Sequence, residues 1–320
     1  MKKVLLAMCL MFMSMQSVNA QLLTAALHHQ GKVTIYGSDK LSTAMNDAVA
    51  GDTLYLSEGS FPNALTITKA IRVIGVGSAS TGIMTEVRGG ISVAIPDGVS
   101  HTGCQIRDIR TTTLTVSKAV DSLNVSKCVF SGETNFNAAT SHAYFDRCQF
   151  LSVFWLSTNI SDTEIVASKL KDVRGAASNA TDAIFTNCNI RLLNNYYSMG
   201  VGAPCLATYL NSVIGKFTST SWSYMSANTT YINCLCGSDF YTFSTYQDCW
   251  TNSNITFDDD DNVTLASGSL SDYIGSDGTV VGCTGSANPF TLVPNTPHLT
   301  DINLDVDNKS KKLTVTMTVE

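Results

Sequence analysis

One short pattern recurs along the middle of the chain at a spacing of 20 residues. Each copy has an apolar residue, a Cys or Ser three positions later, and in most copies a second apolar residue two positions after that. The copies begin at Val125, Phe145, Ile165 and Phe185, and looser copies begin at Tyr209 and Tyr231. A unit of about 20 residues is too short for two packed helices but suits one coil of a solenoid. The repeat therefore restricts the chain to a stack of similar short units.

The apolar residues of each copy lie in short runs bounded by Asn, Ser, Thr and Gly, which favours strands over helices. In a parallel stack, each apolar column packs on its own copies about 4.8 Å above and below. Parallel crossovers are almost always right-handed. We therefore expect an all-β, right-handed parallel β-helix over residues 21–290. A further match at Tyr246 comes after only 15 residues, too few for a full coil, and we leave it out of the column.

The position just before each Cys or Ser is expected to be a bend. The apolar residue and the Cys or Ser both point inward but are three positions apart, so the two residues between them must bend the chain. Asn, which is frequent at this position, is the non-glycine residue that best tolerates a positive φ. The cysteines of the repeat should be buried thiols acting as small apolar side chains, because parallel stacking points neighbouring thiols the same way and disfavours disulfides. The bend residues are Lys127, Arg147, Ala167, Asn187, Asn211 and Asn233.

Both ends of a solenoid need a cap, because the first and last coils expose their cores. An amphipathic pattern between Ser38 and Gly51 predicts a short capping helix at about 39–50. The apolar residues of this pattern are Leu41, Ala44, Met45, Ala48 and Val49. At the other end, two alternating runs flank residues 307–310, so residues 291–320 should form a β-hairpin that acts as a cap or tail.

The chain after this helix resembles the opening of the pectin-lyase-like β-helix superfamily. The resemblance rests on the helical segment 43–48, on Gly51-Asp52-Thr53-Leu54 and on Glu58-Gly59-Ser60-Phe61. Residues 275–290 are similar to the ending of secreted β-helix proteins of Bacteroides-type bacteria. This resemblance implies the parallel β-helix fold. It leaves the activity open, although the enzymes of that superfamily are mostly polysaccharide lyases or hydrolases.

Residues 1–20 have the pattern of a secretory signal peptide, with two lysines, an apolar stretch and a small-residue cleavage site before Gln21. We expect export through the inner membrane to the periplasm, the outer surface or the medium. No later segment has 18 uninterrupted apolar residues, so no transmembrane segment is expected after cleavage. The formal net charge of −6 argues against nucleic-acid binding.

Two sets of charged residues are candidates for chemistry. A polysaccharide lyase needs a cation or basic residue to neutralise the uronate and a Lys or Arg as base. Lys127 and Arg147 should stack one coil apart and could serve an acidic sugar, although solvated bend residues are the simpler interpretation. The acidic run is a candidate calcium site or, more simply, an exposed turn, and no other cofactor is expected. Its members are Asp258, Asp259, Asp260 and Asp261.

Aromatic residues are concentrated between positions 196 and 250. Trp222 and Tyr224 alternate with serines, which places both rings on one face of an extended segment. Together with Tyr241 they are candidates for stacking against a sugar, and loop packing is the alternative.

The sequence contains no Gly-His-Gly motif of the superfamily's hydrolases, and its five histidines are scattered. We therefore expect a secreted or cell-surface, non-catalytic β-helix protein whose lateral face binds a polysaccharide or a surface protein. The alternative is a divergent polysaccharide lyase or hydrolase acting on an acidic plant or host glycan, with Lys127, Arg147 and a bound calcium as the lyase machinery.

Overall fold

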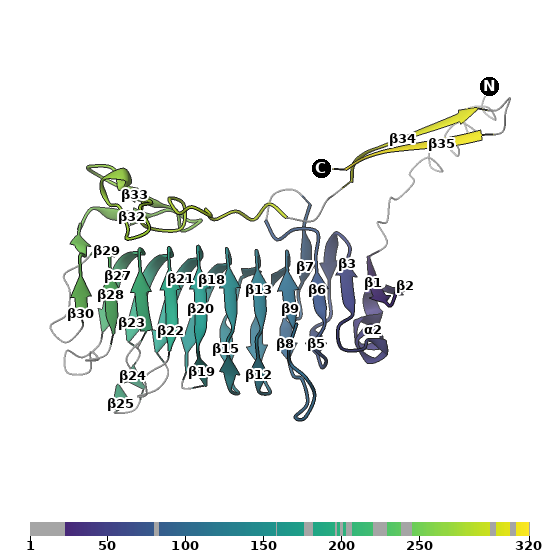
Figure 1. The fold of residues 1–320 in the computed structure, drawn as a ribbon, viewed down its shortest axis with the longest axis horizontal. Helices are drawn as coiled ribbons and strands as arrows, with labels where there is room; N and C mark the ends of the chain where they lie inside the picture. The colour runs from purple at the N-terminus through teal and green to yellow at the C-terminus, as the bar shows by residue number, and fades with distance from the viewer. Residues whose placement is uncertain are drawn as a thin grey trace, which may run out of the picture.

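The computed structural model describes residues 23–79, 83–157, 159–175, 182–195, 197–198, 201–202, 207–219, 229–237, 245–294, 299–307 and 312–319. The proposed signal peptide lies outside these residues. Within them the chain is a parallel β-solenoid with a single short α-helix (Figure 1). No helix in this part of the chain is long and apolar enough to cross a bilayer.

Sheet A has twelve strands and contains one strand from each successive coil. Its strands, in spatial order, are β2 (Lys32–Gly37), β1 (Thr24–His29), β3 (Thr53–Leu56), β6 (Arg72–Ile74), β9 (Gln105–Arg107), β13 (Asn124–Ser126), β17 (Tyr144–Asp146), β20 (Thr163–Val166), β22 (Ala183–Thr186), β26 (Ala207–Leu210), β28 (Thr230–Ile232) and β30 (Thr245–Gln247).

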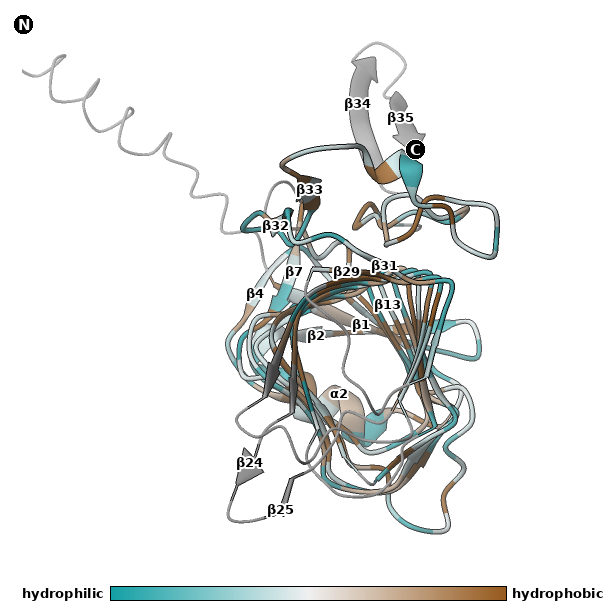
Figure 2. Ribbon diagram, turned by 90° about the vertical axis from the view of Figure 1, so that its left-hand side faces the viewer, coloured by the Kyte–Doolittle hydropathy of each residue, from teal (hydrophilic) through white to brown (hydrophobic). Residues whose placement is uncertain are grey.

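Sheet B follows sheet A within each coil. Its main stack consists of β4 (Gly59–Phe61), β7 (Thr85–Val87), β10 (Arg110–Thr111), β14 (Val129–Phe130), β18 (Gln149–Leu156), β21 (Lys169–Gly175), β23 (Asn189–Asn195), β27 (Val213–Ser219), β29 (Leu235–Cys236) and β31 (Trp250–Thr251). A second stack joins it through β18 and consists of β5 (Leu65–Ile67), β8 (Ile91–Val93), β11 (Leu114–Val116) and β15 (Thr134–Phe136). Viewed along the axis, the coils superimpose around one interior (Figure 2).

Three smaller pairings lie outside the two main sheets. A third parallel sheet contains β12 (Val120–Asp121), β16 (Thr140–Ser141) and β19 (Ile160–Ser161). Two antiparallel pairs are β24 (Tyr197–Ser198) with β25 (Val201–Gly202), and β32 (Ile255–Phe257) with β33 (Val263–Leu265).

The predicted register is confirmed. Val125 pairs with Phe145, Phe145 with Ile165, and Ile165 with Phe185. The column continues through Tyr209 and Tyr231. All six side chains are buried, so the repeat seen in the sequence is the interior of sheet A.

Excluding Tyr246 from the column was wrong. Tyr246 pairs with Tyr231, and their rings stack at 5.1 Å with an interplanar angle of 8°. The register depends on strand pairing and not on coil length, so a coil of 15 residues still brings its strands into line. The ladder of stacked rings runs from Phe185 through Tyr209 and Tyr231 to Tyr246.

The bend column has the predicted left-handed backbone. The φ angles are 50° at Lys127, 46° at Ala167 and 49° at Asn211, and Asp108 and Asp248 extend the column with 57° and 50°. The cysteines that follow the bends are free. Burial raises the pKa of the Cys128 thiol to about 12, as expected for an apolar surrounding.

The N-terminal end differs from the expectation in two details. The helix α2 (Leu41–Asp47) follows a short 3-10 turn, η1 (Ser38–Lys40), and is shorter than predicted. Its buried residues pack into the solenoid core, but Val49 is 51% exposed and lies outside the apolar face. In addition, β1 and β2 form an antiparallel pair that extends sheet A before β3, and the sequence analysis did not anticipate it.

At the C-terminal end the predicted hairpin is present as β34 (Leu299–Asp307) paired antiparallel with β35 (Lys312–Val319). Between β31 and this hairpin lies a segment that we call the strap, residues 252–294. The strap leaves the last coil and runs back along the outside of the solenoid towards the early coils (Figure 1). The short turn η3 (Leu270–Asp272) lies within it.

Candidate functional site

Residues 282–293 of the strap pass the coils in reverse order. The N–H of Gly282 donates to the carbonyl of Asn211 at 2.8 Å. The N–H of Cys283 donates to Oδ1 of Asn189 at 3.1 Å. Further along the strap, Asn288 accepts from Arg147 at 3.0 Å and Val293 accepts from Lys127 at 2.5 Å. From Gly282 to Val293, rising strap numbers therefore meet falling solenoid numbers, and this part of the strap lies antiparallel to the stack.

The surface beneath the strap is one outward-facing column of sheet B. Strand pairing fixes its order as Glu86, Arg110, Val129, Gln149, Lys169, Asn189, Val213, Leu235 and Trp250. The column is apolar at its late end, where Val213 and Leu235 form a small second core with Val281 of the strap. It is polar in its middle and early part, so the strap is held there by hydrogen bonds and ion pairs.

The acidic run is a turn in which one of the four side chains, that of Asp261, is buried against the solenoid. Asp258 accepts hydrogen bonds from Nδ2 of Asn262 at 2.8 Å and from the N–H groups of Asn262 and Asp260 at 2.8 and 2.9 Å, and these bonds lower the pKa of Asp258. Asp261 has a φ of 58° and points inward, where only 1% of it is exposed. Its Oδ1 lies 2.6 Å from Nε of Arg191. Burial raises the pKa of Asp261 even so.

The four aspartates therefore do not share one role. Asp258 shapes the turn, Asp261 anchors it, and Asp259 and Asp260 keep their side chains exposed. The expectation of a wholly exposed turn is wrong for Asp261. Across the described residues, no three side chains of His, Cys, Asp or Glu are grouped to hold a metal ion.

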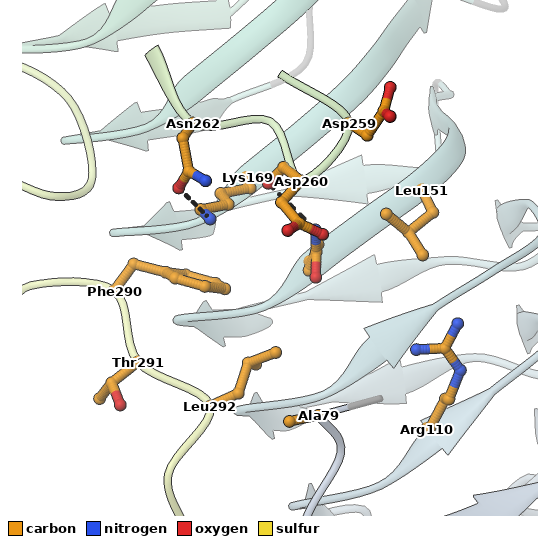
Figure 3. Close-up of a pocket in the computed structure, with 11 residues that line it drawn as sticks. Ala79, Arg110, Leu151, Lys169, Asp259, Asp260, Asn262, Phe290, Thr291 and Leu292 are labelled. Carbon is orange, nitrogen blue, oxygen red and sulfur yellow. Dashed lines mark hydrogen bonds between the residues drawn. The ribbon is translucent and has the colours of Figure 1, made fainter. Parts of the chain in front are cut away.

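A pocket of about 410 Å³ opens where the strap bridges the polar part of the column (Figure 3). The solenoid contributes Arg110, Gln149, Leu151 and Lys169 to its walls, together with Ala79. The strap contributes Asp259, Asp260, Asn262, Phe290, Thr291 and Leu292. The site is thus built from two segments that are far apart in sequence, so no local sequence motif predicts it.

The polar groups of the pocket are mostly engaged. Nζ of Lys169 donates to Oδ1 of Asn262 at 2.7 Å and lies 4.4 Å from the centre of the Phe290 ring. Nε2 of Gln149 donates to the carbonyl of Asp260 at 3.2 Å. Arg110 lies at the other end of the pocket from Lys169 (Figure 3). The two are three coils apart, or about 14 Å at the usual strand spacing.

Arg110 differs from most arginines of the protein. Five of the seven pair with a carboxylate: Arg88 with Glu86, Arg107 with Asp108, Arg147 with Asp146, Arg174 with Asp172 and Arg191 with Asp261. The side chains of Arg72 and Arg110 have no ion pair or hydrogen bond to any described residue, although the charge of Arg110 helps to lower the pKa of Glu86. Glu86, the nearest acid in the column, is already bonded by Ser60 at 2.6 Å and by Arg88 at 3.0 Å. Arg110 is thus the unpaired guanidinium in the pocket.

The predicted basic pair is not solvated. Lys127 is 2% exposed, and burial lowers its pKa. Arg147 holds Asp146 at 2.5 Å and Asn288 of the strap. The two residues do lie one coil apart, as predicted, but they serve to bind the strap. The interpretation of solvated bend residues is therefore wrong, because the strap covers them.

The aromatic candidates Trp222, Tyr224 and Tyr241 lie outside the described residues. Sequence reasoning missed Arg110, Gln149, Lys169 and Phe290. Phe290 lies far from the repeat in sequence. The other three look like ordinary outward-facing residues of sheet B, and only the path of the strap makes them line a pocket. Comparisons with protein-family models, with curated proteins and with solved structures find no match to this chain.

Proposed function

We propose that the protein is an exported, non-catalytic β-helix protein that binds a glycan carrying acidic groups, and that the pocket between strap and sheet B holds one short stretch of that glycan. The observation that carries the proposal is the unpaired guanidinium of Arg110. A planar guanidinium binds carboxylate or sulfate oxygens through two parallel hydrogen bonds. In this pocket no described carboxylate already occupies it.

The rest of the pocket suits a sugar. Phe290, Leu151 and Leu292 supply apolar surface for the carbon face of a ring. The exposed carboxylates of Asp259 and Asp260 accept hydrogen bonds from hydroxyl groups. They also repel a densely charged chain, so a sparsely acidic glycan fits better than a polyanion.

The lyase alternative receives less support. Its two basic residues, Lys127 and Arg147, are held by strap contacts and by Asp146. A uronate reaches them only if residues 288–293 leave the solenoid. Export through the signal peptide and membership of the pectin-lyase-like superfamily remain part of the proposal. They rest on residues 1–20 and on the motifs at 51–54 and 58–61.

The test is binding of the purified protein to partly methyl-esterified oligogalacturonate, to the full methyl ester and to a sparsely sulfated galactan oligosaccharide. We expect binding to an acidic probe, and a loss of about 10-fold or more when Arg110→Gln removes a charged hydrogen-bond donor. The matched control is Arg72→Gln, which removes the other unpaired arginine, on sheet A. Equal affinity of wild type and Arg110→Gln for every probe contradicts the assignment of the pocket.

Catalysis is followed in the same samples. Release of an absorbing 4,5-unsaturated product, or of new reducing ends, contradicts the non-catalytic proposal. Phe290→Ala tests the sugar-facing wall, with the exposed Tyr55→Ala on β3 as its control.

A further inference from the structure

Lys169 and Asn262 join the solenoid to the strap through a contact between an amine and an amide. Nζ of Lys169 lies 2.7 Å from Oδ1 of Asn262, across 93 positions of sequence. Since a C=O bond is about 1.2 Å long, Nζ is at most about 3.9 Å from the Cγ atom of Asn262. Reacting atoms in a near-attack arrangement are about 3 to 3.5 Å apart. A small side-chain movement therefore brings the amine within reach of the amide carbon.

The surroundings of this pair shield it from solvent. Lys169 is only 5% exposed, and the Phe290 ring covers its Nζ at 4.4 Å. The nucleophile in an attack on an amide carbon is the neutral amine, so the ammonium must first pass a proton to an acceptor close by. The neighbouring Cys283 is also buried, so the inner side of the contact is closed.

Two carboxylates flank the pair in useful places. Oδ2 of Asp258 accepts from Nδ2 of Asn262 at 2.8 Å, which holds the amide nitrogen and fixes the plane of the amide. Asp261, the residue before Asn262, is 1% exposed, and neither of its carboxylate oxygens has a well-formed hydrogen bond. The charge of Lys169 acts on both Asp258 and Asp261. Arg191 pairs with Oδ1 of Asp261 at 2.6 Å, but burial still raises the pKa of Asp261 whereas that of Asp258 is lowered, so Asp261 is the more basic of the two carboxylates.

We propose that Lys169 and Asn262 form an intramolecular isopeptide bond that covalently fastens the strap to sheet B. The side-chain movement brings the Lys169 ammonium to the Asp261 carboxylate, which takes a proton from it, and the neutral Nζ attacks Cγ of Asn262. The Nζ–Cγ bond forms, the Cγ–Nδ2 bond breaks, and Nδ2 leaves as ammonia with one proton from the attacking nitrogen. Asp261 then returns its proton to the ammonia. The reaction needs no oxidant and no cofactor.

The bond would also change the pocket. Lys169 would lose its charge on becoming an amide, and Arg110 would then be the one cation lining it among the described residues. The strap would be held across 93 positions by a link that unfolding cannot break.

The test is the mass of the intact, purified protein under denaturing conditions. We expect a mass about 17 Da below that calculated from the sequence, the loss of one ammonia. Proteolysis should give a branched peptide that contains both residues. The loss should be absent from Lys169→Arg and from Asn262→Ala. It should persist in Asn254→Ala, which removes a strap asparagine that bonds Ser267 and Asn252 instead.

Asp261→Asn separates the chemistry from the contact. The variant keeps the side-chain shape but removes the proton acceptor, so the mass loss should be absent or much slower. An unmodified mass for the folded wild-type protein after prolonged incubation at neutral pH contradicts the proposal, whatever the variants show. A mass loss that persists in Lys169→Arg contradicts it as well, because the ammonia would then come from another amide.

Discussion

The Nζ atom of Lys127 donates a hydrogen bond to the backbone carbonyl of Val293, which lies 166 positions further along the chain. The donor stands at a bend of the solenoid and the acceptor near the end of the strap. Together with the contact between Arg147 and Asn288, this pair shows that the strap covers the bend column here, so these bends face the strap and not solvent. The environments of Lys127 and Arg147 therefore depend on the strap.

Ala167 occupies a left-handed position, with a φ of 46°. A side chain there costs about 1 to 2 kcal/mol relative to glycine, before the greater unfolded-state entropy of glycine is counted. We expect Ala167→Gly to raise the free energy of unfolding by about 1 kcal/mol in a denaturant titration. The control is Ala183→Gly on β22, a buried position that lacks a positive φ, where the same change should lower stability. A loss of stability in both variants contradicts the strain argument.

Asp108 gives the protein a pH-dependent stability. Burial raises its pKa from 3.8 to about 6, although Arg107 and Lys127 act against the shift. The pKa of Asp108 is higher in the folded state than in the unfolded state, so folding favours the protonated carboxyl. The stability that the protonated form contributes is therefore lost as the pH rises through about 6. Asp108→Asn should match wild type near pH 3.5 and exceed it by about 3 kcal/mol at pH 8. Parallel stability curves over this range contradict the shift.

Arg191 neutralises the buried carboxylate of Asp261. Arg191→Gln leaves that charge without its partner, which costs about 3 kcal/mol for a buried pair. The loss should appear locally, as faster hydrogen exchange in residues 255–294 with little change in sheet A. Arg72→Gln is the matched control, because Arg72 is exposed and has no described partner. Unchanged exchange in the strap shows that Arg191 does not hold it.

Phe150 lies in the centre of the core, with 1% exposed. Its ring is 5.0 Å from that of Phe130 and 5.0 Å from that of Phe154. Phe150→Asp places a carboxylate among aromatic rings and should cost more than about 4 kcal/mol, enough to prevent accumulation of folded protein. Asp259→Asn changes an exposed side chain and should melt like the parent. Normal melting of Phe150→Asp refutes the register.

Cys249 is the half-buried member of the eight described cysteines, and the other seven are buried. A hydrogen bond from Cys234 lowers the pKa of Cys249 to about 7, whereas burial raises the pKa of Cys104 to about 12. Among these eight, N-ethylmaleimide at neutral pH should therefore modify Cys249 first, in the native protein. Peptide mapping gives the order of labelling, and Cys249→Ser is the control. Equal labelling of all eight would mean that the core is open.

The interior of the solenoid was predictable because it obeys a local rule. The spacing of Val125, Phe145, Ile165 and Phe185 repeats in sequence and is reproduced by strand pairing. The left-handed bends followed from the same spacing. Coil length misled the assignment of Tyr246, since the loop lengths between sheets vary freely while the pairing does not.

The site was not predictable in the same way. In the sequence, Lys127 and Lys169 look like ordinary outward-facing lysines, because nothing shows that the strap covers them. The strap itself has no sequence repeat from which its contacts could be predicted. Phe290 joins Arg110 in one pocket although 180 positions separate them in sequence. Contacts of that range depend on the path of a single irregular segment, which composition and spacing do not encode.

The strap also constrains how the protein can evolve. Solenoids usually gain or lose coils by duplication or deletion of a repeat, because each coil interacts mainly with its neighbours. Here an added coil between Lys127 and Asn211 would displace their strap partners by about 4.8 Å along the axis. The strap would then need one or two more residues in the matching interval. The length of the strap is therefore matched to the number of coils, and the two must change together.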